Sequence, residues 1–142
     1  MATVIFYEKP GCINNTKQKA LLKAAGHDLE VRNLLAETWT AESLRSFFGQ
    51  LPVADWFNRS APKIKSQEVI PEQIDTETAL SLMLQDRLLI RRPLMQVGDR
   101  REVGFDVDRI DKWIGLQPID ASQRSKVEDL THQDLQTCPN SH

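Results

Sequence analysis

The sequence predicts an α/β fold, and three features near its start support this prediction. An apolar run over residues 3–7 suits a buried strand, a helix-patterned stretch follows over 14–25, and a second strand-like run occupies 28–33. Gly26 stands where the helix is expected to stop. A connection of this length between two strands implies a parallel pair joined by a right-handed crossover. The chain is therefore expected to open with a β-α-β unit.

The middle of the chain is patterned for short helices. Apolar residues recur there at helical spacing, and residues that favour helix starts and stops interrupt them. The predicted segments are a helix capped by Thr40 and ending before Gly49, a turn from Pro52 to Phe57, a loop over 58–62, and a helix capped by Asp75 or Thr76 with Leu80, Met83, Leu84 and Leu88 on one face.

The last third predicts a hairpin and a final helix. Residues 94–97 and 102–105 read as the two arms of the hairpin, and a helix starting near 106–108 should stop at Gly115. The resulting order, β-α-β, helices, β-β-α, is the thioredoxin-type layout with a helical insertion over about 38–88. We expect one domain over 1–117 and a polar, disordered tail over 118–142.

Composition and charge argue against several classes of function. The 142 residues suffice for one domain with its own core, and the 40% apolar and 27% charged content is ordinary for a globular protein. A net charge of -2 argues against direct nucleic-acid binding. No apolar run reaches membrane-spanning length, and the start lacks the basic lead of a secretory signal. We expect a cytoplasmic protein without membrane contact, and the cysteine and histidine spacing predicts no metal site.

Cys12 is the strongest candidate for chemistry. It lies on the turn between the first strand and the first helix, where helical N–H groups favour thiolate over thiol. An inert core cysteine is the plain alternative, but the preceding Pro10-Gly11 turn and the helix start favour a reactive sulfur. Asn14, Asn15 and Thr16 could donate hydrogen bonds to a bound anion, although helix capping alone would also explain them.

Three elements together resemble a known family. They are Cys12 after the first strand, the loop Asn58-Arg59-Ser60, and Leu89-Ile-Arg-Arg-Pro93 leading into Val103-Gly-Phe105. In these elements the chain resembles the arsenate reductase (ArsC) family, thioredoxin-like proteins that include the Spx transcription regulators, over residues 1 to about 117. The segment 8–16 is most similar to the subgroup of nitrogenase-associated proteins.

The resemblance implies roles for individual residues. Cys12 matches the nucleophilic cysteine, Arg59 and Arg92 match arginines that hold the anion, and Pro93 matches a cis proline beside the cysteine. Two departures stand against it. The reductases carry a further arginine after the hairpin, where this chain has residues 103–106 without one, and the second cysteine of the Spx Cys-x-x-Cys motif is Asn15 here.

Two function classes follow from this pattern. The first is a thiol-dependent oxidoreductase, with glutathione as co-substrate or glutaredoxin as partner and no tightly bound cofactor. The second is a non-catalytic regulatory or docking module, as Spx is on RNA polymerase, here for a nitrogenase-related client. We interpret Cys138 as an incidental thiol rather than a resolving one, and Lys9 as a solvated loop lysine. Of Arg91 and Arg92, at most one should face Cys12.

Overall fold

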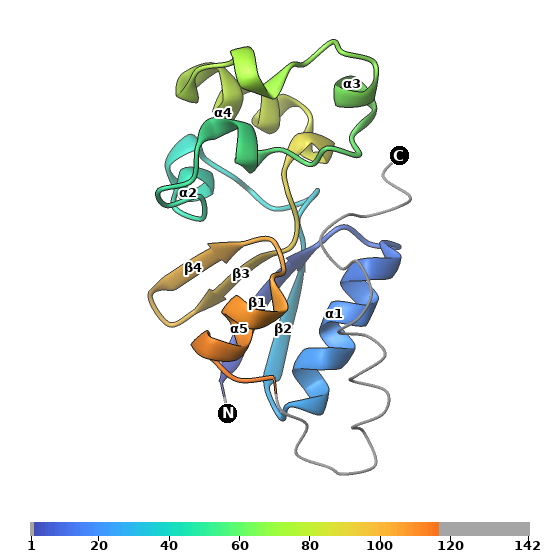
Figure 1. The fold of residues 1–142 in the computed structure, drawn as a ribbon, viewed down its shortest axis with the longest axis vertical. Coiled ribbons are helices and arrows are strands. Elements are labelled where there is room, and N and C mark those ends of the chain that lie inside the picture. Colours follow the sequence, from blue (N-terminus) through green and yellow to red (C-terminus); the bar gives the residue numbers. More distant parts are fainter. Residues whose placement is uncertain (1, 117–142) are drawn as a thin grey trace.

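The computed structural model describes residues 2–116, and its centre is a four-stranded sheet. The strands are β1 (Thr3–Glu8), β2 (Asp28–Asn33), β3 (Leu94–Val97) and β4 (Arg100–Val103), arranged in the order β2-β1-β3-β4 (Figure 1). β2 pairs with β1 in parallel, and β3 and β4 continue the sheet in antiparallel fashion. The α/β class and the opening β-α-β unit are confirmed.

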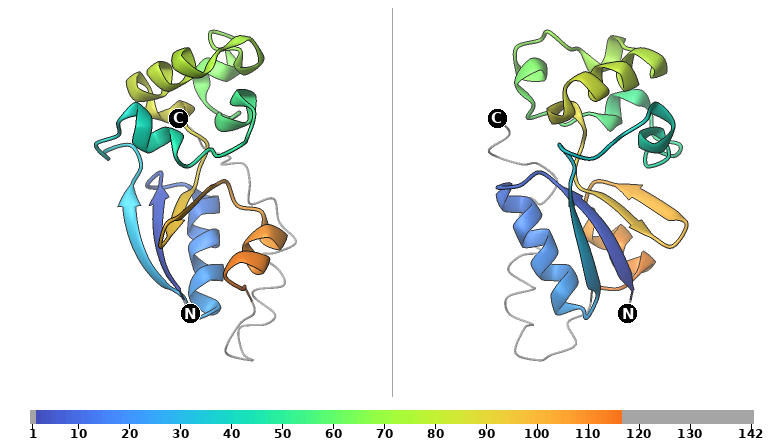
Figure 2. Two further views of the ribbon diagram at one scale, coloured as in Figure 1. Left: turned by 90° about the vertical axis from the view of Figure 1, so that its left-hand side faces the viewer. Right: turned by 180° about the vertical axis from the view of Figure 1, so that it is seen from behind.

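Two helices cover one face of this sheet. α1 (Ile13–Ala24) and α5 (Val107–Trp113) lie on the same side of the strands (Figure 2). Residues from the sheet, both helices and their flanks form one buried apolar cluster there: Val4, Phe6, Leu21, Leu22, Met95, Phe105, Ile110 and Leu116. Gly26 has a φ of +88°, the left-handed conformation that ends a helix.

The helical insertion lies at one end of the sheet, between β2 and β3 (Figure 1). Its elements are α2 (Ala41–Arg45), η1 (Val53–Trp56), α3 (Pro62–Lys65), η2 (Pro71–Gln73), α4 (Thr76–Gln85) and η3 (Arg87–Leu89). They enclose a second apolar cluster that Tyr7 and Leu94 join from the sheet. The insertion therefore packs onto the ends of β1 and β3.

The structure confirms the predicted helix-capping residues Thr40 and Asp75. The Thr40 side chain accepts a hydrogen bond from the Ser43 backbone N–H in a reciprocal capping box, and Asp75 caps α4 through the Thr78 N–H at 2.8 Å. Pro52 precedes η1 as expected. These signals were readable because each involves residues that are neighbours in sequence.

Other boundaries were wrong. α2 ends at Arg45 rather than continuing to Gly49, and a short helix begins at Pro62, where we expected a loop. Proline suits a first helical position because its missing N–H has no helical partner there. The second hairpin arm is 100–103, not 102–105, because Gly104 takes a φ of +79° and turns its N–H to the Pro93 carbonyl at 2.9 Å.

His27, for which the sequence suggested no role, joins distant parts of the chain. It is buried, its Nδ1 accepts from the Ala2 backbone N–H at 3.0 Å, and its Nε2 lies 2.7 Å from the Gly115 carbonyl. The predicted disordered tail and Cys138 lie outside the described residues. Within residues 2–116, none of the helices has the length and apolar character needed to cross a bilayer.

Candidate functional site

Cys12 stands at the N-cap position of α1, as the sequence predicted. Its backbone is extended, with φ −74° and ψ 118°, and its side chain makes no capping hydrogen bond to the helix. The Cys12 N–H donates to the Lys9 carbonyl at 3.1 Å, which closes the turn through Gly11, whose φ is +84°. Cys12 is disulfide-bonded in the structure, and the residue is 1% exposed. The sulfur therefore belongs to a defined turn at the positive end of a twelve-residue helix.

The first turn of α1 holds the Cys12 loop in place. The Asn15 side-chain oxygen accepts from the Lys9 backbone N–H at 3.1 Å, and its amide donates to Gln18 Oε1 at 2.9 Å. Thr16 donates to the Cys12 carbonyl through its hydroxyl at 3.2 Å, and Asn14 is buried. Asn15 and Thr16 thus position the loop, and neither acts as the N-cap residue itself.

Arg92 lies just before the start of β3, at the end of the sheet that faces the insertion (Figure 1). The Arg92-Pro93 peptide bond is cis, as predicted, and the Arg92 side chain is 3% exposed. Burial lowers the pKa of its guanidinium to about 10. The Arg91 N–H donates to the Trp56 carbonyl at 3.0 Å, so the insertion fixes the backbone that carries Arg92.

Lys9 was wrongly interpreted as a solvated loop lysine. It is 8% exposed, and burial together with the nearby charge of Arg92 lowers the pKa of its ammonium group. Figure 1 shows that the β1–α1 turn and the start of β3 both lie at the end of the sheet facing the insertion. Lys9 follows β1 and Arg92 precedes β3, so both cations lie at this end. The burial of Lys9 could not be predicted from its neighbours in the sequence, because Arg92 comes near it through β3, which is remote along the chain.

Arg59 is engaged elsewhere. Its guanidinium forms an ion pair with Glu72 at 2.7 Å and donates to the Ala54 carbonyl at 3.2 Å. Both partners belong to the insertion, and the Arg59 side chain is half exposed. The structure brings Lys9, Cys12 and Arg92 to one end of the sheet and gives Arg59 contacts within the insertion.

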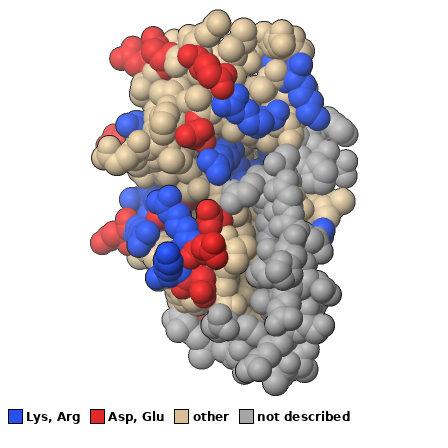
Figure 3. All heavy atoms as spheres, viewed as in Figure 1, with Lys and Arg blue, Asp and Glu red and all other residues tan. Residues whose placement is uncertain are grey.

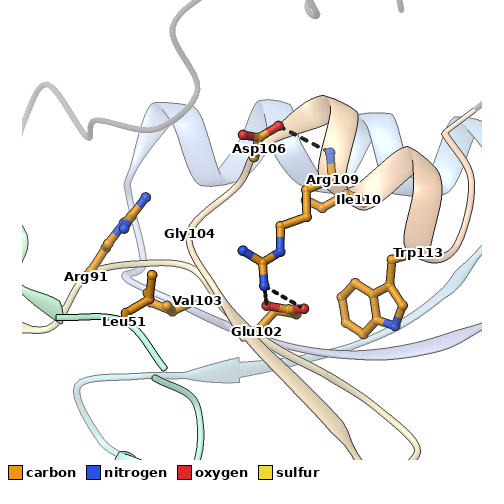
Figure 4. Close-up of a pocket in the computed structure, with 9 residues that line it drawn as sticks. All are labelled: Leu51, Arg91, Glu102, Val103, Gly104, Asp106, Arg109, Ile110 and Trp113. Atoms are coloured by element: carbon orange, nitrogen blue, oxygen red, sulfur yellow. Dashed lines mark hydrogen bonds and ion pairs between the residues drawn. The ribbon is translucent and has the colours of Figure 1, made fainter. Parts of the chain in front are cut away.

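Arg91 and Gly104 both line a small cavity (Figure 4). A Cβ atom on Gly104 would lie 2.8 Å from Arg91 Nη2, and Arg91 Nη1 donates to the Asp55 carbonyl at 3.1 Å. The guanidinium therefore lies over the post-hairpin segment, where the family resemblance leads one to expect an arginine side chain. Arg91 supplies positive charge at this segment from a different part of the chain.

On the side of this cavity opposite Arg91, charged side chains form a network of ion pairs (Figure 4). Glu102 pairs with Arg100 at 2.8 Å and with Arg109 at 2.9 Å, and Arg100 stacks over Trp113 at 5.1 Å from the ring centre. Figure 3 shows charges of both signs side by side over the hairpin region. These contacts join β4 to α5. Among the described residues, no cluster of three histidine, cysteine or acidic side chains could hold a metal ion.

The fold and the cysteine at the start of α1 define a thioredoxin-like α/β protein with a helical insertion. Residues 7–113 match the ArsC family, and the chain belongs to this family. Its structure is similar to that of a putative ArsC family related protein from Bacteroides fragilis, with a TM-score of 0.68 and 24% identity over 78% of this chain and 97% of the other. An arsenate reductase from Vibrio cholerae gives a TM-score of 0.64 and 18% identity over 82% and 98% of the two chains.

Sequence relatives extend the comparison. A 15.7 kDa uncharacterized protein of the draG 3′ region in Rhodospirillum rubrum is 50% identical over 98% of this chain and 90% of its own length. A global transcriptional regulator, Spx 2 of Bacillus anthracis, is 21% identical over 78% and 86% of the two chains. The family thus includes enzymes and regulators, and the site has to distinguish between them.

Proposed function

We propose that this protein is a cytoplasmic thiol-dependent oxidoreductase in which Cys12 forms a mixed disulfide with glutathione. The observation that carries this proposal is the placement of Cys12 at the start of α1, at the same end of the sheet as Lys9 and Arg92. A helix N-terminus and nearby cations both favour the thiolate, which is the reactive form of cysteine.

The proposed exchange has two steps. The Cys12 thiolate attacks one sulfur of glutathione disulfide, the S–S bond breaks, and glutathione leaves as a thiolate while the protein–glutathione disulfide forms. A second thiol, from glutathione or glutaredoxin, then attacks the mixed disulfide and returns Cys12 as a thiolate. Cys12 is disulfide-bonded and 1% exposed in the structure, so a thiol must reduce that disulfide before Cys12 can act as a thiolate.

Arsenate is a weaker candidate substrate. A doubly charged tetrahedral oxyanion needs several donors around it, and Arg59 is bound to Glu72 and the Ala54 carbonyl. We therefore expect slow or absent arsenate reduction alongside measurable glutathione uptake.

The test uses reduced protein in a Cys138→Ser background, so that Cys12 is the one cysteine in the chain. After treatment with oxidised glutathione, intact mass spectrometry should show one added glutathione, and Cys12→Ser in parallel should show none. A coupled arsenate assay completes the experiment. Folded protein that takes up no glutathione would refute the oxidoreductase proposal, and rapid arsenate turnover would refute the substrate preference.

A docking role is the second candidate, and the burial of Cys12 favours it. The similarity of segment 8–16 to nitrogenase-associated proteins suggests a nitrogenase-related client, and the R. rubrum relative is named for its place beside draG. Co-purification of a nitrogenase component with the Cys12→Ser variant as efficiently as with the unmodified chain would support docking without catalysis.

A further inference from the structure

β2 forms one edge of the sheet, and no other strand of the described residues pairs with its outer side (Figure 1). The Asp28 N–H donates to the Ala2 carbonyl at 3.0 Å, and the Leu34 N–H donates to the Glu8 carbonyl at 2.8 Å. Because successive residues of a strand direct their backbone groups to opposite sides, the even-numbered residues of β2 bond to β1. The outward N–H and C=O groups therefore belong to Leu29, Val31 and Asn33.

The exposed side chains of β2 place an apolar residue between two opposite charges. Val31, the middle one of the outward residues, is 44% exposed. Glu30 and Arg32 flank it on the opposite face of the strand, where they form an exposed ion pair at 2.7 Å. Charges of one sign on an edge strand would prevent its pairing with a second copy of itself. Charges of opposite sign, two residues apart, instead make this edge complementary to itself.

One antiparallel register between two copies of β2 satisfies all of these features. When Val31 lies opposite Val31 of the second copy, Glu30 of each copy lies opposite Arg32 of the other. The two Val31 side chains then lie side by side on one face of the joined sheet. Because the outward backbone groups belong to odd-numbered residues, the Glu30–Arg32 pairs take the non-hydrogen-bonded positions, whose Cα atoms approach to about 4.5 Å. Opposite charges therefore meet at the closest positions of the ladder.

The same register satisfies the outward backbone groups at the centre of β2. The two Val31 residues exchange a pair of hydrogen bonds, each N–H donating to the opposing carbonyl. Each Asn33 N–H donates to the Leu29 carbonyl of the other copy. The reverse bonds do not form, because the Asn33 carbonyl already accepts from the N–H groups of Ala36 and Glu37 at 3.2 and 3.1 Å. The ladder thus ends where the turn after β2 begins.

We propose that this protein forms a symmetric dimer in which the β2 edges of two copies pair antiparallel and join the two sheets into one. The interface is isologous, since the same strand serves both copies about a two-fold axis. Backbone hydrogen bonds and the Val31 contact hold the dimer together, and the Glu30–Arg32 pairs set its register, because exposed ion pairs add little affinity. An interface of one strand per copy is small, so the dimer is weak and forms at high protein concentration.

Sedimentation equilibrium of the reduced protein, with dithiothreitol present so that no disulfide links two chains, measures dimerisation from low micromolar to near-millimolar concentration. Val31→Pro removes the outward N–H, and a proline is tolerated where the N–H of an edge strand faces solvent. Val31→Thr is the matched control, because it keeps both the N–H and a β-branched side chain. Glu30→Arg and Arg32→Glu each set like charges against each other in self-pairing, whereas a hybrid dimer of these two variants has opposite charges at both pairs.

We expect the unmodified chain and Val31→Thr to dimerise alike and Val31→Pro to stay monomeric. Each charge reversal alone should weaken the dimer about tenfold, because both cross-strand pairs change from attraction to repulsion. An equal mixture of the two reversed variants should dimerise about as well as the unmodified chain. Circular dichroism confirms that each variant is folded.

Two results would overturn the proposal. The first is an unmodified chain that stays monomeric at every concentration, and the second is a dimer that all variants retain equally, which would place the interface elsewhere. If Val31→Pro does not fold, the charge-reversed variants decide alone. A mixture that associates no better than its separate components would then show that β2 does not pair with itself.

Discussion

Substitution of Gly104 by alanine tests the close packing between Arg91 and the segment after the hairpin. Gly104 has a φ of +79°, and a Cβ there would lie 2.8 Å from Arg91 Nη2. An L-residue in this left-handed conformation costs roughly 1–2 kcal/mol. The new methyl group also displaces the guanidinium from the Asp55 carbonyl, and loss of that hydrogen bond adds roughly 0.5–1.5 kcal/mol.

Gly98→Ala provides the matched control. Gly98 also has a positive φ, +57°, but beyond its chain neighbours no atom of the described residues lies within 4 Å of the place that a Cβ would take. Both substitutions reduce the entropy of the unfolded chain equally, so this contribution cancels in the comparison. Urea denaturation should therefore show Gly104→Ala to be less stable than Gly98→Ala by about 0.5–1.5 kcal/mol. Equal destabilisation of the two variants would refute the account of Arg91.

Three further predictions concern the Cys12 loop and its surroundings. Asn15→Ala should lower the free energy of unfolding, measured in urea, by about 1–3 kcal/mol, because it removes the acceptor for the buried Lys9 N–H. An unchanged free energy of unfolding would contradict this. Arg59→Ala should leave the rate of glutathione uptake unchanged, since Arg59 is held by Glu72 in an exposed ion pair, and a large loss of rate would show that it joins the site. Burial lowers the pKa of Lys9 below 10.5, so the charged side chain lowers the stability of the folded protein at neutral pH. This loss of stability becomes smaller as the pH rises through the folded-state pKa towards 10.5, because the side chain then becomes neutral. The stability gain of Lys9→Met, measured by urea unfolding against pH, should therefore shrink in the alkaline range, and a gain that grows with pH would contradict the sign.

The sequence was informative where structure depends on neighbouring residues. Thr40 and Asp75 cap helices through N–H groups three residues away, and Gly26 ends α1 by its own conformation. The position of Cys12 at the start of α1 was predicted from the same kind of short-range sequence pattern. Such features are set by short-range hydrogen bonds and backbone sterics, which a linear pattern records.

The remainder of the site depends on contacts between remote segments. Lys9 is buried with Arg92 nearby because β3 pairs with β1, and Arg91 lies over Gly104 because a left-handed glycine leaves room for it. Arg59 matches an anion-binding arginine by its position in the sequence, yet the fold places Glu72 beside it. A list of residue types cannot distinguish a buried cation from an exposed one until strand register is known.

The measurement that tests the central claim most directly is the pKa of Cys12. Burial alone would raise the pKa of the thiol, whereas the start of α1 and the positive charges of Lys9 and Arg92 would lower it. Alkylation rates against pH, for the reduced Cys138→Ser protein with the double variant Cys12→Ser/Cys138→Ser as blank, give this value. We predict a pKa well below that of an unperturbed cysteine, about 8.5. A value at or above about 8.5 in the folded protein would show that desolvation dominates and that Cys12 is not the activated nucleophile of this site.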